Sequence, residues 1–222
     1  MTRLTLYHGS SRIIETPCFG AGNPHNDYGL GFYCTLHEEL ACEWACAAEG
    51  AGGFANKYVF DSSDLRMLDL AAEPYTILHW LALLVENRVF EAKTPVAVEG
   101  KRFLRERYLL PIEEYDVIRG YRADDSYFSF ARAFLRNDIA LEQLSRAMRL
   151  GNLGEQVVLK SPRAFERLCF EGARPAASEV YYPQRMERDE NARRLYREEA
   201  SRLGIGGLYL RDILQGGGNE GL

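Results

Sequence analysis

Three separated stretches of the chain hold polar or aromatic side chains at the ends of segments with the composition of β-strands. They are His8-Gly9-Ser10, Tyr28-Gly29-Leu30-Gly31-Phe32-Tyr33 and Glu155-Gln156-Val157-Val158-Leu159. A glycine lets a bound molecule approach the backbone closely, because it carries no side chain. Flat, rigid aromatic rings suit the binding of another ring, and a carboxylate can stabilise positive charge that develops during a reaction. Each stretch is common by itself, but their order and strand contexts together indicate one ligand site assembled from distant parts of the chain.

These stretches, in this order, resemble the diphtheria-toxin and poly(ADP-ribose) polymerase class of ADP-ribosyltransferases. That class places a His on its first strand, commonly in His-Gly-Ser or His-Gly-Thr, a Tyr after a Gly-x-Gly-x-Tyr stretch, and a Glu at the start of a later strand. The matching residues here are His8, Tyr33 and the pair Glu155-Gln156. In the polymerases a second nicotinamide-stacking aromatic follows the Tyr by eleven positions, and Trp44 stands at that position here.

The resemblance covers mainly residues 4–48 and 152–160. The middle of the chain lacks the motifs of the polymerases, so the chain looks like an uncharacterised bacterial relative of the class. It implies an α+β fold with an ADP-ribosyltransferase-like split β-sheet core, and NAD as co-substrate. The implied function is that of a mono-ADP-ribosyltransferase, which cleaves the nicotinamide–ribose bond and transfers ADP-ribose to a macromolecular acceptor, expected to be a protein. Such bacterial relatives resemble the toxins of toxin–antitoxin operons, which implies a small antitoxin protein as a partner.

The resemblance also implies a role for each matching residue. His8 would hydrogen-bond the adenosine-side ribose, Gly9 would hold the nicotinamide carboxamide, and the rings of Tyr33 and Trp44 would sandwich the nicotinamide. Arg122 is a further candidate, for the pyrophosphate, because it precedes an aromatic-rich helix; the alternative for the Asp124-Asp125 pair that follows it is ordinary N-capping. The full expected NAD-binding set is His8, Gly9, Ser10, Gly31, Tyr33, Trp44 and Arg122.

At the third position the chain departs from the class, and two alignments remain open. The catalytic set is His8, Tyr33, Gln156 and Glu155, with Gln156 favoured at the catalytic point because strand alternation puts it on the same side as Val158. A glutamine keeps a carbonyl acceptor for a ribose hydroxyl but carries no charge. Loss of one electrostatic group from such a site costs roughly 3–4 kcal/mol. The expected enzyme is therefore slow or strictly mono-transferring, unless Glu155 supplies the charge.

Other interpretations of the same residues remain. His8 could be a structural histidine, Tyr33 a core aromatic of a strand, and Trp44 a core residue that shares a helix face with Leu40. A catalytically silent module that binds NAD, or only keeps the fold for interaction with a partner, is the alternative from another class. An NAD glycohydrolase, in which water replaces the acceptor, is a third.

Composition places the chain among globular proteins. It has 222 residues, of which 46% are hydrophobic and 27% charged, with a formal net charge of −5. A mildly acidic chain has no overall field that gathers nucleic acid, although a local basic patch could. The longest apolar stretch, residues 77–85, is interrupted by His79 and is too short to cross a bilayer. The first residues show no secretion signal, and the five cysteines lack metal-ligand spacing. We therefore expect a cytoplasmic protein with buried free thiols and no metal.

Strand-like and helix-like segments alternate irregularly, which indicates α+β rather than a doubly wound parallel sheet. Strands are expected over residues 3–7, 32–34, 57–60, 65–70, 115–118 and 156–159. Helices are expected over residues 35–48, 75–90, 98–109, 126–135 and 139–150, from Ser161-Pro162 onward, and over 183–203, with a last compact element at 204–214. One domain is predicted over residues 1–222, with a helical insertion at roughly 71–112 and C-terminal helices at roughly 178–215.

Local signals support some of these boundaries. Thr35-Leu36-His37-Glu38 is typical of a capping box, Ser161-Pro162 of a helix start, and Gly151 of a helix C-cap. The long irregular segment from about residue 14 to 29 is of the kind that usually carries function. The mixed charges of residues 183–203 predict a solvated helix, with a partner-binding helix as the less favoured alternative.

Overall fold

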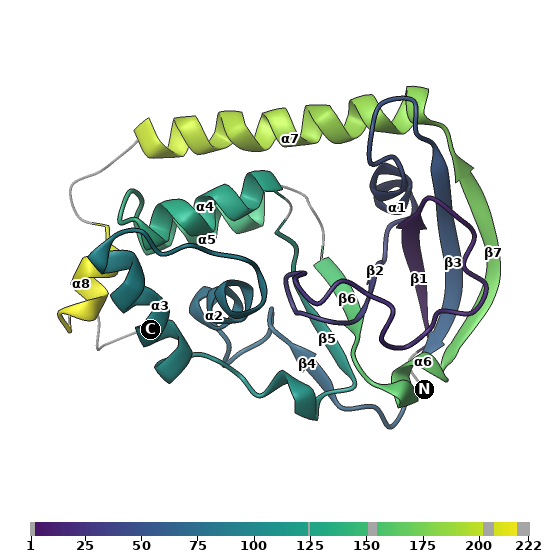
Figure 1. The fold of residues 1–222 in the computed structure, drawn as a ribbon, viewed down its shortest axis with the longest axis horizontal. Helices are drawn as coiled ribbons and strands as arrows, with labels where there is room; N and C mark the ends of the chain where they lie inside the picture. The colour runs from purple at the N-terminus through teal and green to yellow at the C-terminus, as the bar shows by residue number, and fades with distance from the viewer. Residues whose placement is uncertain (1–2, 124, 151–154, 202–206, 217–222) are drawn as a thin grey trace.

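The computed structural model describes residues 3–123, 125–150, 155–201 and 207–216. In this part of the chain seven strands form one sheet, in the order β4-β5-β6-β2-β1-β3-β7 (Figure 1). The strands are β1 (Arg3–Ser10), β2 (Phe32–Thr35), β3 (Gly53–Asp61), β4 (Met67–Asp69), β5 (Val117–Tyr121), β6 (Glu155–Leu159) and β7 (Leu168–Ala176). Strands β4 and β5 are parallel, and the other neighbours are antiparallel. The protein is therefore α+β, with a mixed sheet.

The helices divide between the two halves of the sheet. They are α1 (Glu38–Ala45), α2 (Ile77–Asn87), α3 (Pro95–Arg107), α4 (Asp125–Leu135), α5 (Leu141–Leu150), α6 (Pro162–Phe165), α7 (Ser178–Ser201) and α8 (Leu210–Leu214). Helices α2 to α5 and α8 gather beside the β4–β6 half, whereas α1 packs on β1 and β3 (Figure 1). The long helix α7 contacts α1 at one end of its path and α4 and α5 at the other, so it spans both halves (Figure 1).

The two halves of the sheet meet at a narrow seam between β1 and β2. Strand β1 pairs with β3 along its whole length, and β2 pairs with β6 through all four of its residues. Between β1 and β2, both fully described, Tyr7 opposite Thr35 is the only register pair. Next to this pair a side chain joins the strands instead: His8 Nδ1 donates to the Tyr33 carbonyl at 2.7 Å.

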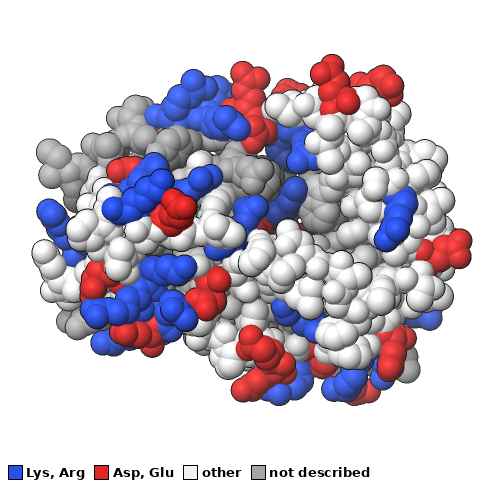
Figure 2. Space-filling model, viewed as in Figure 1, with Lys and Arg blue, Asp and Glu red and all other residues white. Residues whose placement is uncertain are grey.

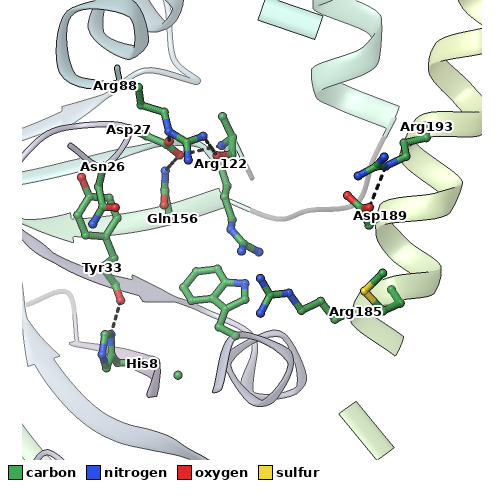
Figure 3. A pocket seen from close by; sticks show the side chains of 14 residues that line it. His8, Asn26, Asp27, Tyr33, Arg88, Arg122, Gln156, Arg185, Asp189 and Arg193 are labelled. Atoms are coloured by element: carbon green, nitrogen blue, oxygen red, sulfur yellow. Dashed lines mark hydrogen bonds and ion pairs between the residues drawn. The ribbon is translucent and has the colours of Figure 1, made fainter. Parts of the chain in front are cut away.

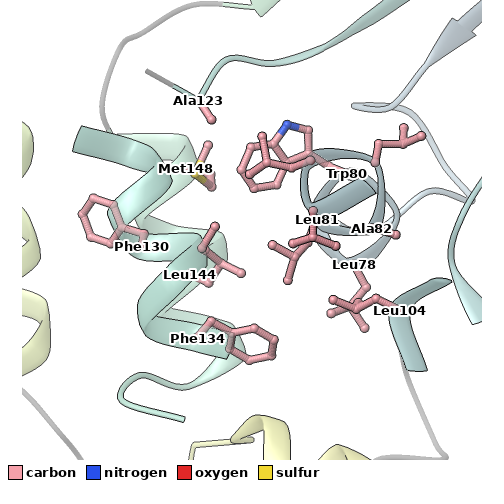
Figure 4. Packing of buried hydrophobic residues seen from close by; sticks show 14 of the residues in the cluster. Leu78, Trp80, Leu81, Ala82, Leu104, Ala123, Phe130, Phe134, Leu144 and Met148 are labelled. Carbon is pink, nitrogen blue, oxygen red and sulfur yellow. The ribbon is translucent and has the colours of Figure 1, made fainter. Parts of the chain in front are cut away.

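Apolar side chains cover both faces of the central strands. The largest cluster lies between the helices and the β4–β6 half of the sheet, and Figure 4 shows its close packing around α2, with Trp80, Phe130, Phe134 and Leu144 among its members. In β6, Val158 belongs to this cluster, while Val157 and Leu159 belong to a second one. Burial on both faces explains the continuous apolar run of this strand, and alternation puts Gln156 on the same face as Val158.

The predicted capping box at Thr35 is wrong. Thr35 is the last residue of β2, where it pairs with both Tyr7 and Gln156. The Thr35 hydroxyl accepts from the His37 backbone N–H, and α1 begins only at Glu38, with His37 as an N-cap that makes no side-chain capping bond. Pairing within the sheet therefore outcompetes the local helix signal. The start predicted at Ser161-Pro162 is confirmed, because Ser161 Oγ accepts from the Ala164 N–H.

Several element boundaries also differ from the prediction. Strand β1 continues beyond its predicted end at residue 7 to Ser10, and strand β7 had no predicted counterpart. Helix α7 begins at Ser178, so that Pro183 lies inside it. Of the cysteines expected to be buried, Cys18 and Cys169 are exposed. The predicted C-cap Gly151 and the Asp124 of the predicted N-cap pair lie outside the described residues.

Among the described helices, none combines the length and the apolar character that a membrane span requires.

Candidate functional site

A cavity of about 430 Å³ lies at the seam between β1 and β2, with α1, α7 and the end of β5 around it. Six of the residues predicted from the sequence line it: His8, Gly9, Tyr33, Trp44, Arg122 and Gln156. Figure 3 shows the labelled side chains of this set converging from different elements. We refer to this cavity as the seam pocket.

His8 is fixed in position and in protonation. Its Nδ1 donates to the Tyr33 carbonyl, so that Nε2 is the acceptor of the neutral ring. The ring stacks on Phe32, with centroids 4.3 Å apart and planes at 29°. Burial lowers the pKa of His8, against the opposing effect of the hydrogen bond to Tyr33. The neutral imidazole therefore offers a hydrogen-bond acceptor to a bound molecule at neutral pH.

Gly9 is required for packing as well as for access to the pocket. A Cβ at this position would lie 2.1 Å from the Ala41 carbonyl oxygen and 2.8 Å from the Ala45 nitrogen, both in α1. The absence of a side chain thus lets α1 lie directly on β1. This close approach is what brings Trp44, on α1, to the edge of the pocket.

The hydroxyl of Tyr33 forms hydrogen bonds with the backbone of the preceding loop. It donates to the Gly29 carbonyl at 2.6 Å and accepts from the Tyr28 N–H at 3.0 Å. Gly29 has a φ of +71°, which favours glycine. Burial raises the pKa of Tyr33. Because the hydroxyl is already paired, the aromatic ring is the part of Tyr33 that can contact a ligand by stacking.

Trp44 lies under the guanidinium group of Arg122, and its indole N–H has no hydrogen-bond partner among the described residues. The Arg122 guanidinium carbon lies 4.4 Å from the centroid of the indole, in cation–π geometry. Within the described residues, the buried Trp44 Nε1 has no hydrogen-bond acceptor. Buried indole N–H groups usually find a partner, so this donor is a candidate contact for a ligand.

Gln156 forms a buried polar network with a residue that the sequence did not single out. Its Nε2 donates to Asp27 Oδ2 at 2.9 Å and to the Tyr121 carbonyl at 3.2 Å. Asp27 Oδ2 also accepts from the Ala123 N–H at 2.8 Å, and Oδ1 lies 3.6 Å from Arg88 Nε. Burial raises the pKa of Asp27, while the Ala123 N–H, Arg88 and Gln156 act in the opposite direction.

The remaining predicted site residues lie elsewhere. Glu155 precedes Gln156 on β6, so its side chain faces the opposite side; it pairs with Arg119 and does not line the seam pocket. Ser10 Oγ donates to the Arg12 carbonyl and accepts from Asn56. Gly31 lines a second cavity of about 320 Å³, beside the loop between β1 and β2.

The second cavity adjoins the first. His8, Asn26 and Tyr33 line both of them. The loop that forms much of the second cavity is tied down at its end, because Lys160 Nζ donates to the Tyr28 and Leu30 carbonyls, both at 2.6 Å. The two cavities are therefore neighbours that share part of their walls.

Charged residues that were not predicted from the sequence complete the seam pocket. They are Asp27, Arg88, Arg185, Asp189 and Arg193. With Arg122, the lining holds four arginines and two aspartates, and Figure 2 shows basic side chains at the hollow in the middle of this face. An excess of guanidinium groups suits a phosphate-bearing ligand. In the part of the chain that the structure describes, no group of three or more His, Cys, Asp or Glu could hold a metal.

The prediction that residues 183–203 form only a solvated face is wrong for one side of α7. Arg185, Asp189 and Arg193 line the pocket, and Arg188 makes two hydrogen bonds to the buried Glu43 of α1. Mixed charge at helical spacing cannot distinguish this arrangement from full solvation. Asn26 and Asp27, by contrast, lie in the long loop that was predicted to carry function.

Residues 4–170 match the model of a family described as "Protein of unknown function (DUF3990)", and the chain belongs to this family. No curated protein and no solved structure matches the chain. The matched residues include every element of the seam pocket except α7.

Proposed function

We propose that the protein is an NAD-dependent mono-ADP-ribosyltransferase, which cleaves the nicotinamide–ribose bond and transfers ADP-ribose to a macromolecular acceptor. One observation carries the proposal. Six residues predicted to bind NAD or act on it, spread from His8 to Gln156 in the chain, line one cavity of about 430 Å³. The seam in the sheet, with a single register pair between β1 and β2, supports a split-sheet core of the ADP-ribosyltransferase kind.

Three features of the pocket fit NAD. Its volume lies in the usual range for a ligand site, and the adjoining cavity of about 320 Å³ offers room for a second half of a dinucleotide. The arginines of the lining suit a pyrophosphate. The unpaired Nε1 of Trp44 offers a donor beside a stacking surface.

The reaction breaks the bond between the ribose C1′ and the nicotinamide nitrogen. The electron pair leaves with neutral nicotinamide, positive charge develops on the ribose, and an acceptor nucleophile adds to C1′ and loses its proton. The rings of Tyr33 and Trp44 would flank the nicotinamide, and the Nε2 of neutral His8 would accept from a ribose hydroxyl. Gln156 Oε1 would accept from a hydroxyl of the other ribose, next to the reacting carbon.

The test measures nicotinamide release from NAD by the purified protein, with labelled NAD and cell lysate to detect an acceptor. Wild type should release nicotinamide and label a macromolecule. His8→Ala and Gln156→Ala should each lower the rate at least tenfold, while Glu171→Ala, at an exposed position on β7, should not. Full activity of both pocket variants would refute the proposal.

Glu155→Ala separates the two alignments of the third position. Because Glu155 pairs with Arg119 outside the pocket, its loss should change the rate far less than the loss of Gln156. The opposite ranking would assign the catalytic point to Glu155.

A silent NAD-binding module is the second candidate, and the cation on the Trp44 ring favours it, because Arg122 covers a face that a nicotinamide could use. NAD binding by calorimetry without nicotinamide release would support this module. Release of free ADP-ribose without labelled acceptor would indicate a glycohydrolase.

The toxin role is part of the proposal and has its own test. Expression of the active protein in the bacterial cytoplasm should arrest growth, and the Gln156→Ala variant should not. Rescue by a small co-expressed protein that binds the chain would identify the antitoxin. Normal growth with an enzyme proved active in vitro would remove the toxin role and leave the enzymatic proposal intact.

A further inference from the structure

Asp27 is a buried carboxylate in a loop that would ordinarily be solvated. Only 6% of the residue is exposed, and it lines the seam pocket. Figure 3 shows Asp27 between Arg88 and Gln156, with dashed contacts to its neighbours. Burial of a carboxylate is costly unless its oxygens are paired, so a buried aspartate beside a candidate catalytic residue calls for a specific role.

The contacts of Asp27 fix the orientation of the Gln156 amide. An ionised carboxylate and a backbone carbonyl accept hydrogen bonds and do not donate them. Gln156 meets one of each, Asp27 Oδ2 at 2.9 Å and the Tyr121 carbonyl at 3.2 Å, and offers Nε2 to both. A flipped amide would place Oε1 against two acceptors. Oε1 is therefore held as the acceptor that Gln156 presents to a ligand.

Asp27 also brings negative charge to the site. Gln156 is neutral, whereas the departure of nicotinamide leaves positive charge on the ribose. A charge in a buried site acts more strongly than the same charge in water. The groups that face Asp27 are Arg88 and Arg122 as cations and the phenols of Tyr28 and Tyr33. Burial is the larger effect and raises the pKa of Asp27, while the two cations and the N–H donors favour the ionised carboxylate.

We propose that Asp27 and Gln156 act as one pair, in which Gln156 Oε1 contacts the ribose while Asp27, as a positioning residue, orients the amide and supplies the negative charge that the amide lacks. This inference rests on the proposed function. It explains why a glutamine can stand at the third position. A glutamate there would face Asp27 across about the same short distance as the present hydrogen bond, and two carboxylates in contact cannot both ionise.

The experiment moves the charge between the two positions. Four proteins are compared: wild type, Asp27→Asn, Gln156→Glu and the double variant Asp27→Asn/Gln156→Glu. Asp27→Asn should lower kcat for nicotinamide release at least tenfold with KM for NAD within about threefold, since the ligand contacts remain. Gln156→Glu should also lose activity at neutral pH. The double variant restores one carboxylate and one amide in contact, so it should be at least tenfold more active than either single variant.

The proposed pair would be refuted if the two reductions in kcat multiply in the double variant. It would also be refuted if Asp27→Asn leaves kcat unchanged. Asp138→Asn, an exposed aspartate with a partner on the surface, is the matched control and should leave kcat unchanged. Thermal unfolding of all variants separates lost catalysis from lost folding.

A second measurement does not depend on NAD. In Gln156→Glu the two carboxylates share a proton, so the folded-state pKa of the pair lies above the unfolded value. Stability should then fall as pH rises from about 4.3 through that raised pKa, by more than in wild type or in the double variant. An identical pH profile of thermal unfolding in Gln156→Glu and wild type would show that the side chains are not in contact. If wild type releases no nicotinamide, the proposed function fails and the catalytic role fails with it, while this profile still decides whether the pair exists.

Discussion

The ion pair between Arg188 and Glu43 connects α7 to α1, and residues of α7 line one side of the seam pocket. Arg188 Nε and Nη2 donate to the two Glu43 oxygens at 2.8 and 2.7 Å. The Glu43 side chain is 4% exposed and that of Arg188 is 29% exposed. Substitution of Arg188 by Met keeps the length of the side chain and leaves the buried Glu43 carboxylate without this partner.

The expected cost follows from burial of the carboxylate. Breaking a buried ion pair costs about 3–5 kcal/mol, because one charge is left uncompensated. The lower end applies here, about 3 kcal/mol, since partial exposure of Arg188 lets water reach the vacated position. For a chain of this size the change lowers Tm by about 6–12 °C. Urea unfolding followed by circular dichroism gives the free energy, and a thermal scan gives Tm.

Two further variants make the measurement decisive. Arg194→Met removes a cation from the same helix, where the partner Glu198 and the arginine are both exposed, and should cost less than about 1 kcal/mol. Arg188→Met combined with Glu43→Gln removes both charges and should recover part of the loss. A cost for Arg188→Met no greater than that of Arg194→Met would refute the view that this ion pair holds α7 in place.

Three other outcomes follow from the site. Gly9→Ala should destabilise the protein by about 2 kcal/mol or more in urea unfolding, because its Cβ would overlap the Ala41 carbonyl oxygen; a neutral effect would contradict this packing. Trp44→Ala should raise KM for NAD about threefold to tenfold in nicotinamide-release kinetics, while Trp44→Phe should keep most of the affinity; equal effects of the two would argue against stacking. Because burial lowers the pKa of His8 below its ordinary 6.5, the unfolded state takes up this proton first as pH falls, so stability is lost below about pH 6.5. His8→Gln should therefore show a smaller fall in the free energy of unfolding between pH 7 and 5, and an unchanged fall would contradict a buried neutral histidine.

Local sequence patterns predicted the α+β class and the type of most elements. The apolar run of β6, the helical periodicity of α2 and the Ser161 cap are signals carried by neighbouring residues, and such signals persist in the fold. Thr35 shows their limit. Its capping-box pattern was genuine, but pairing with Tyr7 and Gln156 in the sheet decided its conformation.

Strand β7 shows a second limit. Residues 168–176 include a glycine and a proline and are mostly partly or fully exposed. Only the first residues alternate, with Leu168 and Phe170 packed against the core. The hydrogen bonds that make the whole segment a strand come from β3. Edge strands of this kind are defined by a partner that lies elsewhere in the chain.

The candidate site also combines residues that local sequence patterns predicted with residues that only the tertiary structure places there. His8, Gly9, Tyr33, Trp44 and Gln156 were predicted from their resemblance to the motifs of a known class, and Arg122 from its position before an aromatic-rich helix; the structure brings the six to one pocket. The sequence by itself determined the wider set that also holds Ser10, Gly31 and Glu155, because glycines, aromatic rings and strand starts are local features, and the structure selected these six from it. Only the tertiary structure decided which charges accompany them. A loop aspartate and a charged helix have the same sequence pattern whether water or protein surrounds them. Distant segments decide their surroundings: Asp27 is buried beside β6, and α7 packs against α1.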